Sequence, residues 1–138
     1  MDVMLCDDHA VVRAGLQRVP DSIDGIEVVA TASHGQEAVD VALELRPDVV
    51  LMDLSMPRLD GVAATRQLTA AAPGTRVVVL TSFHHRRRIA EAIEAGASGY
   101  VLKDATPAEF VDALRGATGA AAGRRARGAW REYAQVVL

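Results

Sequence analysis

Acids, hydroxyls and one amine stand directly after four of the apolar runs in this 138-residue chain. In chain order these residues are Asp7, Asp8, Asp53, Thr81, Ser82 and Lys103. An unpaired buried charge is costly, so a carboxylate that ends a buried run, as Asp53 does, must be wetted by solvent or face a cation. Clustered carboxylates repel one another unless a cation lies among them, and oxygen ligands favour a hard ion such as Mg²⁺.

The same residue types are suited to chemistry on a phosphoryl group. A carboxylate beside Mg²⁺ can act as a nucleophile and form an aspartyl phosphate. The metal, an ammonium group and a hydroxyl would then balance the charge on the phosphoryl oxygens. Lysine suits this task as a compact point charge, and Lys103 is the only lysine among fifteen basic residues. Each residue alone is more often solvated or a helix cap, whereas their joint placement predicts a site.

The elements that must position these residues alternate along the chain. The apolar runs, taken as strands, cover residues 3–6, 26–32, 48–53, 76–80 and 99–102. Apolar residues recur at helical spacing in 35–46, 86–95 and 106–115. Pro47 ends the first of these segments and Gly96 the second, and the pair Thr106-Pro107 begins the third. This alternation predicts an α/β fold, a doubly wound parallel sheet with helices on both faces. Such a sheet binds ligands beyond the carboxyl ends of its strands, so the acids are expected at one edge.

Composition and charge exclude several classes of protein. No apolar run is long enough to cross a membrane, and the N-terminus lacks the features of a secretory signal. The single cysteine, Cys6, lies in an apolar run and is expected to be a buried hydrophobe of a cytoplasmic protein. Residues 1–118 carry a net charge of −6 and residues 119–138 a net charge of +3. The body is therefore not a basic surface for nucleic acid.

Four motifs together carry a family resemblance: "CDDHAVVRAGL", "VVLMDLSMPRLDG", "VVVLTSF" and "AGASGYVLKDATPAEF". They resemble the receiver domain of two-component response regulators, most closely the NarL/LuxR-type subfamily, over residues 1–118. The resemblance implies the flavodoxin-like receiver fold, with five strands in the order 2-1-3-4-5. It also implies a cytoplasmic phosphorelay protein in transcriptional regulation, with a sensor histidine kinase as partner and a possible homodimer.

The resemblance assigns the phosphate and metal site residue by residue. Asp53 would be the phosphoacceptor. Asp8, Asp53 and the backbone carbonyl of Ser55 would bind Mg²⁺, and Asp7 would help through water or by contacting the lysine. The loop that carries the site would be shaped by Pro57 and Gly61.

The resemblance also assigns a switch. Thr81 would turn its hydroxyl to the phosphate and Lys103 would pair with a phosphoryl oxygen. Tyr100 would swing inward as Thr81 moves, and the surface of helix 4, strand 5 and helix 5 would change. Without the resemblance, Tyr100 reads as a half-buried ring at the sheet edge. Ser55 and Phe83 would tune how long the phosphate persists.

Two segments remain open to more than one interpretation. The run "HHRRR", residues 84–88, places three arginines where they oppose a helix dipole. It is either a solvated basic face or a contact for an acidic partner or nucleic acid. Metal binding by His84 and His85 is disfavoured because adjacent residues point to different faces.

The tail, residues 119–138, is rich in Arg, Ala and Gly and is expected to be partly disordered or a short helix. Four of its residues fit one helical face: Trp130, Tyr133, Val136 and Val137. The usual C-terminal helix-turn-helix is absent from these residues, so DNA binding is expected only through an output domain that this chain lacks.

The phosphoacceptor switch is not an enzyme in the usual sense, and three other functions are alternatives to it. A receiver-like interaction module working without phosphate is opposed by the intact set of acids, Thr81 and Lys103. A Mg²⁺-dependent phosphatase of the haloacid-dehalogenase kind needs a second acid two residues after the nucleophile, where Ser55 stands. A nucleotide-binding flavodoxin-like protein would need a Gly-rich loop after the first strand, which the sequence lacks.

Overall fold

The computed structural model describes residues 2–7, 27–54, 59–81, 86–102 and 112–116. Within these ranges five parallel strands form one sheet in the order β2-β1-β3-β4-β5. The strands are β1 (Asp2–Cys6), β2 (Glu27–Ala32), β3 (Val49–Asp53), β4 (Arg76–Thr81) and β5 (Gly99–Leu102). The predicted parallel sheet and its strand order are confirmed, and each predicted strand lies within one residue of an observed one.

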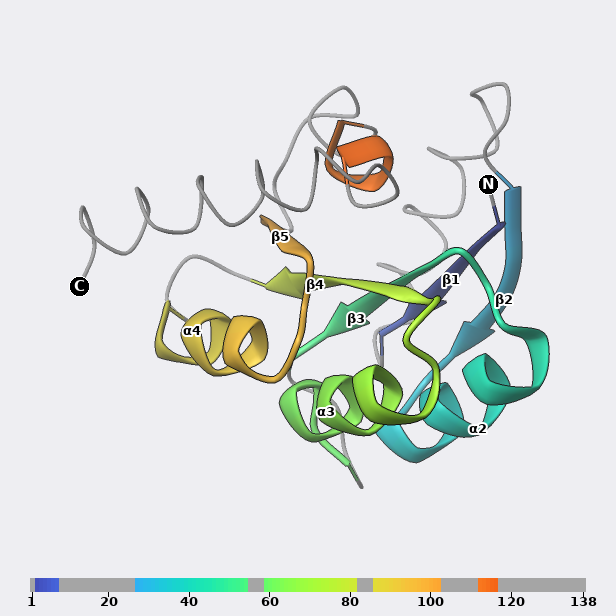
Figure 1. Cartoon of the computed structure of the whole chain (residues 1–138), viewed down its shortest axis with the longest axis horizontal. Coiled ribbons are helices and arrows are strands. Elements are labelled where there is room, and N and C mark those ends of the chain that lie inside the picture. The colour runs from blue at the N-terminus through green and yellow to red at the C-terminus, as the bar shows by residue number, and fades with distance from the viewer. Residues whose placement is uncertain (1, 8–26, 55–58, 82–85, 103–111, 117–138) are drawn as a thin grey trace.

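Helices cover both faces of this sheet. The labelled helices are α2 (Gly35–Leu45), α3 (Gly61–Ala71) and α4 (Arg86–Glu94), and residues 112–116 are also helical. In Figure 1, α2, α3 and α4 lie on one side of the sheet and the short helical segment 112–116 lies on the other. Two buried clusters match these two layers, one on each face of the sheet.

The central strand β3 shows why the apolar runs are continuous. All five of its residues are buried, because the sheet is covered on both faces. Val50 and Met52 belong to the core cluster beneath α2, α3 and α4, whereas Val49 and Leu51 belong to the cluster that includes Leu114. Alternate side chains of one strand therefore supply two cores.

The helices α2 and α4 end where proline and glycine in the sequence predicted. Arg46 closes α2 in the left-handed conformation, with φ of 50°, directly before Pro47. Gly96, with φ of 116°, follows the end of α4. Helix α3 was not predicted from the sequence. Of the predicted helix 106–115, only residues from 112 onward are described, and the tail lies outside the described ranges.

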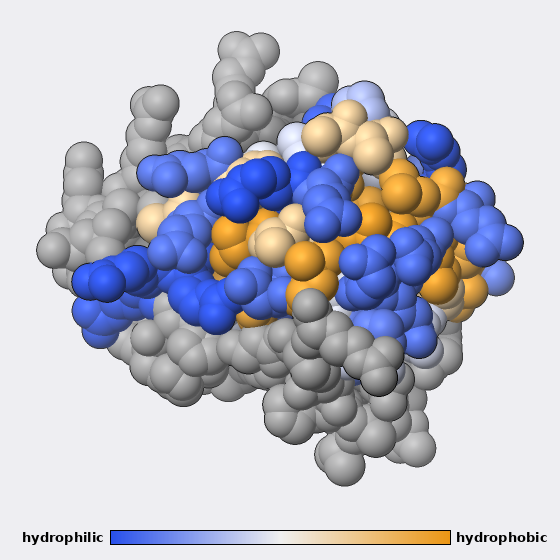
Figure 2. Space-filling view, turned by 90° about the horizontal axis from the view of Figure 1, so that it is seen from below, coloured by the Kyte–Doolittle hydropathy of each residue, from blue (hydrophilic) through white to orange (hydrophobic). Residues whose placement is uncertain are grey.

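The face seen from below carries hydrophobic residues between hydrophilic ones (Figure 2). Among the described residues, the large hydrophobic side chains that are exposed are Val29, at 37%, and Leu45, at 49%. Such isolated exposure is ordinary for a folded domain. The part of the chain that is described contains no helix long and apolar enough to span a bilayer.

Candidate functional site

Asp53 is the last residue of β3, and its side chain is 1% exposed. It pairs in register with Leu80 of β4, and the next residue, Leu54, donates its backbone N–H to the Leu80 carbonyl at 3.3 Å. Asp53 is therefore not a strand-end acid wetted by solvent. A carboxylate so placed needs a neighbouring positive charge or hydrogen-bond donors to remain ionised.

Asp7 lies beside Asp53 at the same edge of the sheet. Cys6 pairs in register with Met52, so the residues that follow them, Asp7 and Asp53, occupy neighbouring positions where two parallel strands end. Asp7 is also 1% exposed, and its backbone N–H donates to the Ala32 carbonyl at 3.0 Å. Neighbouring strands lie only about 5 Å apart, so two buried carboxylates are held close together.

Thr81 and Tyr100 belong to the next two strands. Thr81 ends β4, is fully buried, and pairs in register with Leu102 of β5. Tyr100 is half-buried and packs against the core cluster on the side of α2, α3 and α4. Thr81 and Tyr100 lie at alternate positions from Leu80 and Val101, which face the opposite cluster. Both residues are therefore on the α4 side of the sheet.

Gly61 brings the start of α3 against the main chain of Asp53. A Cβ at this position would overlap the Asp53 carbonyl oxygen, so only glycine fits without a shift. Its backbone N–H donates to the Leu54 carbonyl at 3.2 Å. The preceding residue, Asp60, caps the helix by accepting from the Ala63 N–H at 2.9 Å. The first turn of α3 is thus fixed directly against the strand that ends in Asp53.

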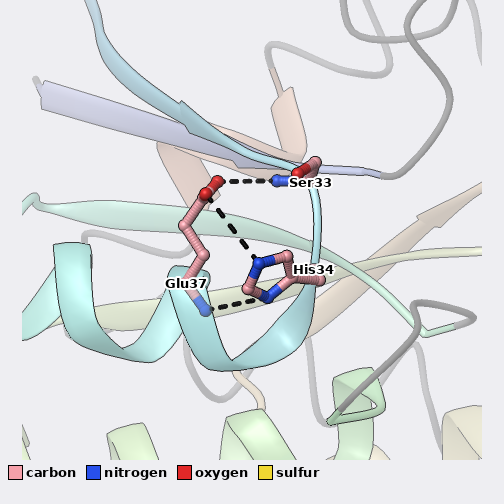
Figure 3. A network of polar contacts seen from close by, with 3 residues as sticks. All are labelled: Ser33, His34 and Glu37. Carbon is pink, nitrogen blue, oxygen red and sulfur yellow. Dashed lines mark hydrogen bonds and ion pairs between the residues drawn. The ribbon is translucent and has the colours of Figure 1, made fainter.

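A histidine forms the corresponding start of α2, next to the end of β1. His34 Nδ1 accepts a hydrogen bond from the Glu37 backbone N–H at 3.2 Å. The Glu37 carboxylate in turn accepts from the Ser33 N–H at 2.9 Å and lies 4.0 Å from His34 Nε2 (Figure 3). This arrangement resembles a capping box, with histidine in place of the usual serine or threonine, but Glu37 accepts from the residue before the cap and not from the cap itself. It fixes the turn that follows Ala32, the residue bonded to Asp7.

The structure therefore brings Asp7, Asp53 and Thr81 to one edge, with Tyr100 one strand further on. The other predicted site residues lie outside the described ranges: Asp8, Ser55, Pro57, Ser82, Phe83, His84, His85 and Lys103.

A profile of the family described as "Response regulator receiver domain" matches residues 3–115. The chain belongs to this family. Its curated relatives include the transcriptional regulatory protein LiaR of Bacillus subtilis, 45% identical over 84% of this chain and 55% of that protein. The response regulator UvrY of Escherichia coli is 42% identical over 83% of this chain and 53% of that protein. These relatives are regulators of the NarL/LuxR type, as the four motifs predicted.

A solved receiver domain has the same fold. The signal receiver domain of the putative response regulator NarL from Mycobacterium tuberculosis matches with a TM-score of 0.78 and 31% identity, over 83% of this chain and 92% of that one. The flavodoxin-like receiver fold is thus confirmed. The chain spans about half the length of the curated relatives that it matches.

The acidic side chains in the described part of this receiver domain are of the kind that binds a hard cation. Asp7 and Asp53 present carboxylate oxygens only, both buried and on neighbouring strands. Oxygen ligands of this kind suit Mg²⁺. The described residues contain no group of three or more His, Cys, Asp or Glu side chains that could hold a metal, and the third predicted acid, Asp8, is not among them.

Cys6 lies just before Asp7 but does not share its chemistry. It is the single cysteine of the chain, and its thiol is buried. Burial raises its pKa strongly, and the charges of Glu37 and Asp7 add to the effect. A thiol held neutral in this way is a poor nucleophile and a poor metal ligand. Cys6 is part of the hydrophobic core, as its apolar run predicted.

Three residues that shape the site were not found by sequence reasoning. His34 and Asp60 cap the helices that start at this edge, and a Cβ at Gly35 would overlap the Leu59 carbonyl. The signal for Asp60 was present, because an Asp before a glycine and an apolar helical segment is a common helix start. The His34-x-x-Glu37 spacing also matches a capping box, but histidine is rarely read as a cap.

Proposed function

We propose that this receiver domain accepts a phosphoryl group on Asp53 from a sensor histidine kinase. The observation that carries the proposal is the burial of Asp53 and Asp7, each 1% exposed, where two neighbouring strands end. Two carboxylates on neighbouring strand ends repel each other unless positive charge lies between them. A site that binds a cation and then a phosphoryl group explains why the fold keeps both. Membership of the receiver family supports this reading.

The transfer itself is a substitution at phosphorus. A carboxylate oxygen of Asp53 attacks the phosphorus of the phosphohistidine, and an O–P bond forms while the P–N bond breaks. The electron pair of the broken bond stays on the imidazole nitrogen. The Lys103 ammonium would pair with a phosphoryl oxygen, and the Thr81 hydroxyl would donate to another. Thr81 ends the strand next to the one that ends in Asp53.

The proposed metal site uses oxygen ligands from three segments of the chain. Asp8, Asp53 and the backbone carbonyl of Ser55 would hold Mg²⁺ directly, and Asp7 would help indirectly. When bound, the ion would supply positive charge that lowers the repulsion among the acids and the phosphoryl oxygens.

The proposed response of the domain passes through Thr81 to Tyr100. Both residues lie on the side of the sheet that α4 covers. A phosphoryl group adds negative charge and hydrogen-bond acceptors, so a Thr81 hydroxyl drawn toward it would change the packing around Tyr100 and α4. Helix α4, strand β5 and the last helix would then present a different surface. Ser55 and Phe83 would set the lifetime of the phosphate.

The rest of the proposal concerns the longer protein and its partners. Residues 1–118 would form the receiver domain and residues 119–138 a separate tail, in line with the family match to residues 3–115. We place the protein in the cytoplasm, as a possible homodimer. Control of transcription, the role that the name of LiaR gives for that protein, would require DNA binding through an output domain.

The experiment that tests the phosphoacceptor is a mass measurement of the intact chain after incubation with acetyl phosphate. With Mg²⁺ present, we expect the mass of one phosphoryl group to be added and hydroxylamine to remove it. Without Mg²⁺ the gain should be strongly reduced. Lys103→Ala should leave metal binding in place and weaken the response to phosphate.

Asp53→Asn should abolish the gain, because an amide is not a nucleophile at this site. The matched control is Asp40→Asn, on the exposed face of α2, which should behave like the wild type. A wild-type chain that gains no mass would favour the module that works without phosphate. Turnover of phosphate esters with Mg²⁺ would favour the haloacid-dehalogenase alternative.

A further inference from the structure

The two ends of α4 are attached to α3 by different kinds of contact. At the end of α4, the backbone of Gly96 lies so close to Thr69 that a Cβ there would overlap the threonine side chain. At the start of α4, Arg88 Nη2 lies 3.3 Å from Asp60 Oδ2. The first contact is close packing of the Gly96 backbone against a side chain, and the second is a single ion pair.

The packed end of α4 is difficult to move. Ala92, in the second half of α4, is fully buried in the cluster under the three helices, and Ala95 and Ala97, which follow the helix, belong to the same cluster. Gly96 also holds a positive φ of 116° that favours glycine. Displacing this end would open space in a close-packed core, which is costly. The end near Gly96 can therefore serve as a pivot.

The first three residues of α4, which precede the buried Ile89, are held more weakly. Arg86, Arg87 and Arg88 place positive charge in a first turn, where the helix dipole disfavours it. The side chains of Arg88 and Asp60 are 34% and 49% exposed, so solvent and salt screen their attraction. A contact of this strength can form and break on the surface without disrupting the fold.

Asp60 connects this contact to the predicted phosphate site. Its Oδ1 accepts from the Ala63 N–H at 2.9 Å, which leaves Oδ2 to meet Arg88. The next residue, Gly61, lies against the main chain of Asp53. On the other side of the contact, α4 begins five residues after Thr81. The ion pair thus joins the segments that leave the Asp53 strand and the Thr81 strand.

We infer that Arg88 and Asp60 form a releasable latch that holds the first turn of α4 to the start of α3, and that phosphorylation acts against this latch. The signalling half of the inference rests on the proposed function, whereas the latch does not. An exposed ion pair that forms in just one of two conformations changes the equilibrium between them about two- to fivefold. Loss of the pair should shift the populations toward the released form by that factor. Arg88 is a positioning residue in this scheme, not a catalytic one.

The test uses the full chain with five variants: Arg88→Ala, Arg88→Lys, Asp60→Asn, the Arg88→Ala/Asp60→Asn pair, and Arg87→Ala. Asparagine caps a helix as well as aspartate does, so Asp60→Asn removes the charge and keeps the cap. Arg87 is the exposed neighbour, so Arg87→Ala is the control for loss of one positive charge. Amide hydrogen exchange over residues 89–94 is measured first, without phosphodonor.

We expect Arg88→Ala and Asp60→Asn each to speed exchange of α4 about two- to fivefold, and the double variant to add little. Arg88→Lys should restore much of the protection, and high salt should bring the wild type toward the variants. Equal exchange in Arg88→Ala and Arg87→Ala would overturn the latch. So would fully additive effects in the double variant.

The second measurement is the initial rate of phosphorylation by acetyl phosphate with Mg²⁺. The latch variants should react faster than the wild type by a factor similar to that seen in exchange, an increase that simple destabilisation would not produce. Unchanged rates beside faster exchange would overturn the link to signalling. A wild type that takes no phosphate would overturn the proposed function and that link together, while exchange alone would still decide the latch.

Discussion

Helices α3 and α4 begin at the same edge of the sheet, but their first turns are built in opposite ways. Asp60 caps α3 with a carboxylate, which accepts a backbone N–H and suits the positive end of the helix dipole. The first turn of α4 contains three arginines and no acid. One of these arginines, Arg88, reaches across to the acid that caps α3.

The start of α3 is fixed by more contacts than the start of α4. The start of α3 is determined by local contacts, since Asp60 caps it and Gly61 seats it on the strand that ends in Asp53. The start of α4 takes its balancing charge from another helix. Helix α3 can therefore hold the candidate phosphoacceptor in place, whereas in the proposed latch only the first turn of α4 is released.

The largest expected effect tests whether α3 is fixed by close packing. Gly61→Ala would place a methyl group on the Asp53 carbonyl oxygen, so the backbone must shift. We expect the free energy of unfolding to fall by about 1–3 kcal/mol, the usual cost of overpacking. Urea unfolding of the full chain measures it, and the rate of phosphorylation should fall as well.

The matched control for this variant is Gly74→Ala. Among the described residues, apart from the two chain neighbours, no atom lies within 4 Å of a Cβ built at Gly74, so the stability of the variant should stay within about 0.5 kcal/mol of the wild type. Equal effects at the two glycines would mean that the contact between α3 and Asp53 is not close.

The second prediction separates the two roles of Asp60. Asp60→Ala removes both the cap and the ion pair, and we expect the free energy of unfolding to fall by about 1–2 kcal/mol. Asp60→Asn removes only the ion pair, so its cost should be about 0.2–1 kcal/mol. Urea unfolding at low and high salt measures both effects. If the two variants are equally destabilised, the cap contributes nothing and α3 is not fixed locally.

Sequence patterns predicted the sheet and its edge because each depends on local residue types. Continuous apolar runs marked the strands, and Asp53 could be assigned to an edge because parallel strands end together. The end of the strand at Asp53 predicted either contact with solvent or a neighbouring cation, and Asp53 is shielded from solvent. The assignment of its partners Asp8 and Lys103 remains a prediction.

Contacts between distant elements were not predictable in the same way. The run of arginines was read as a solvated face or a contact for an acidic partner, whereas Arg88 has an acidic neighbour within the chain. Asp60 and Arg88 are 28 positions apart, and only the packing of α3 beside α4 brings them together. Similarly, no propensity rule shows that a Cβ at Gly35 would overlap the Leu59 carbonyl.

The third prediction extends the comparison to α2, which begins with the histidine cap. His34→Ala removes the acceptor of the Glu37 N–H, and we expect a loss of about 0.5–1 kcal/mol in the free energy of unfolding. His34→Ser supplies a hydroxyl in the same role and should recover most of that loss. Urea unfolding and amide exchange at the start of α2 measure both variants. A serine variant no better than the alanine one would show that the imidazole acts through packing instead.

The smallest effect concerns the exposed arginine of α4. Arg87→Glu replaces a cation in a first turn with an anion, which the helix dipole favours, so the free energy of unfolding should rise by about 0.5 kcal/mol. Arg66→Glu makes the same change of net charge at an exposed position in the interior of α3, where the dipole contributes little. The gain at Arg87 should shrink at high salt. Equal changes in the free energy of unfolding at both positions would mean that the net charge of the chain, and not the dipole at the start of α4, causes them. The contrast between the two helix starts would then have no electrostatic basis.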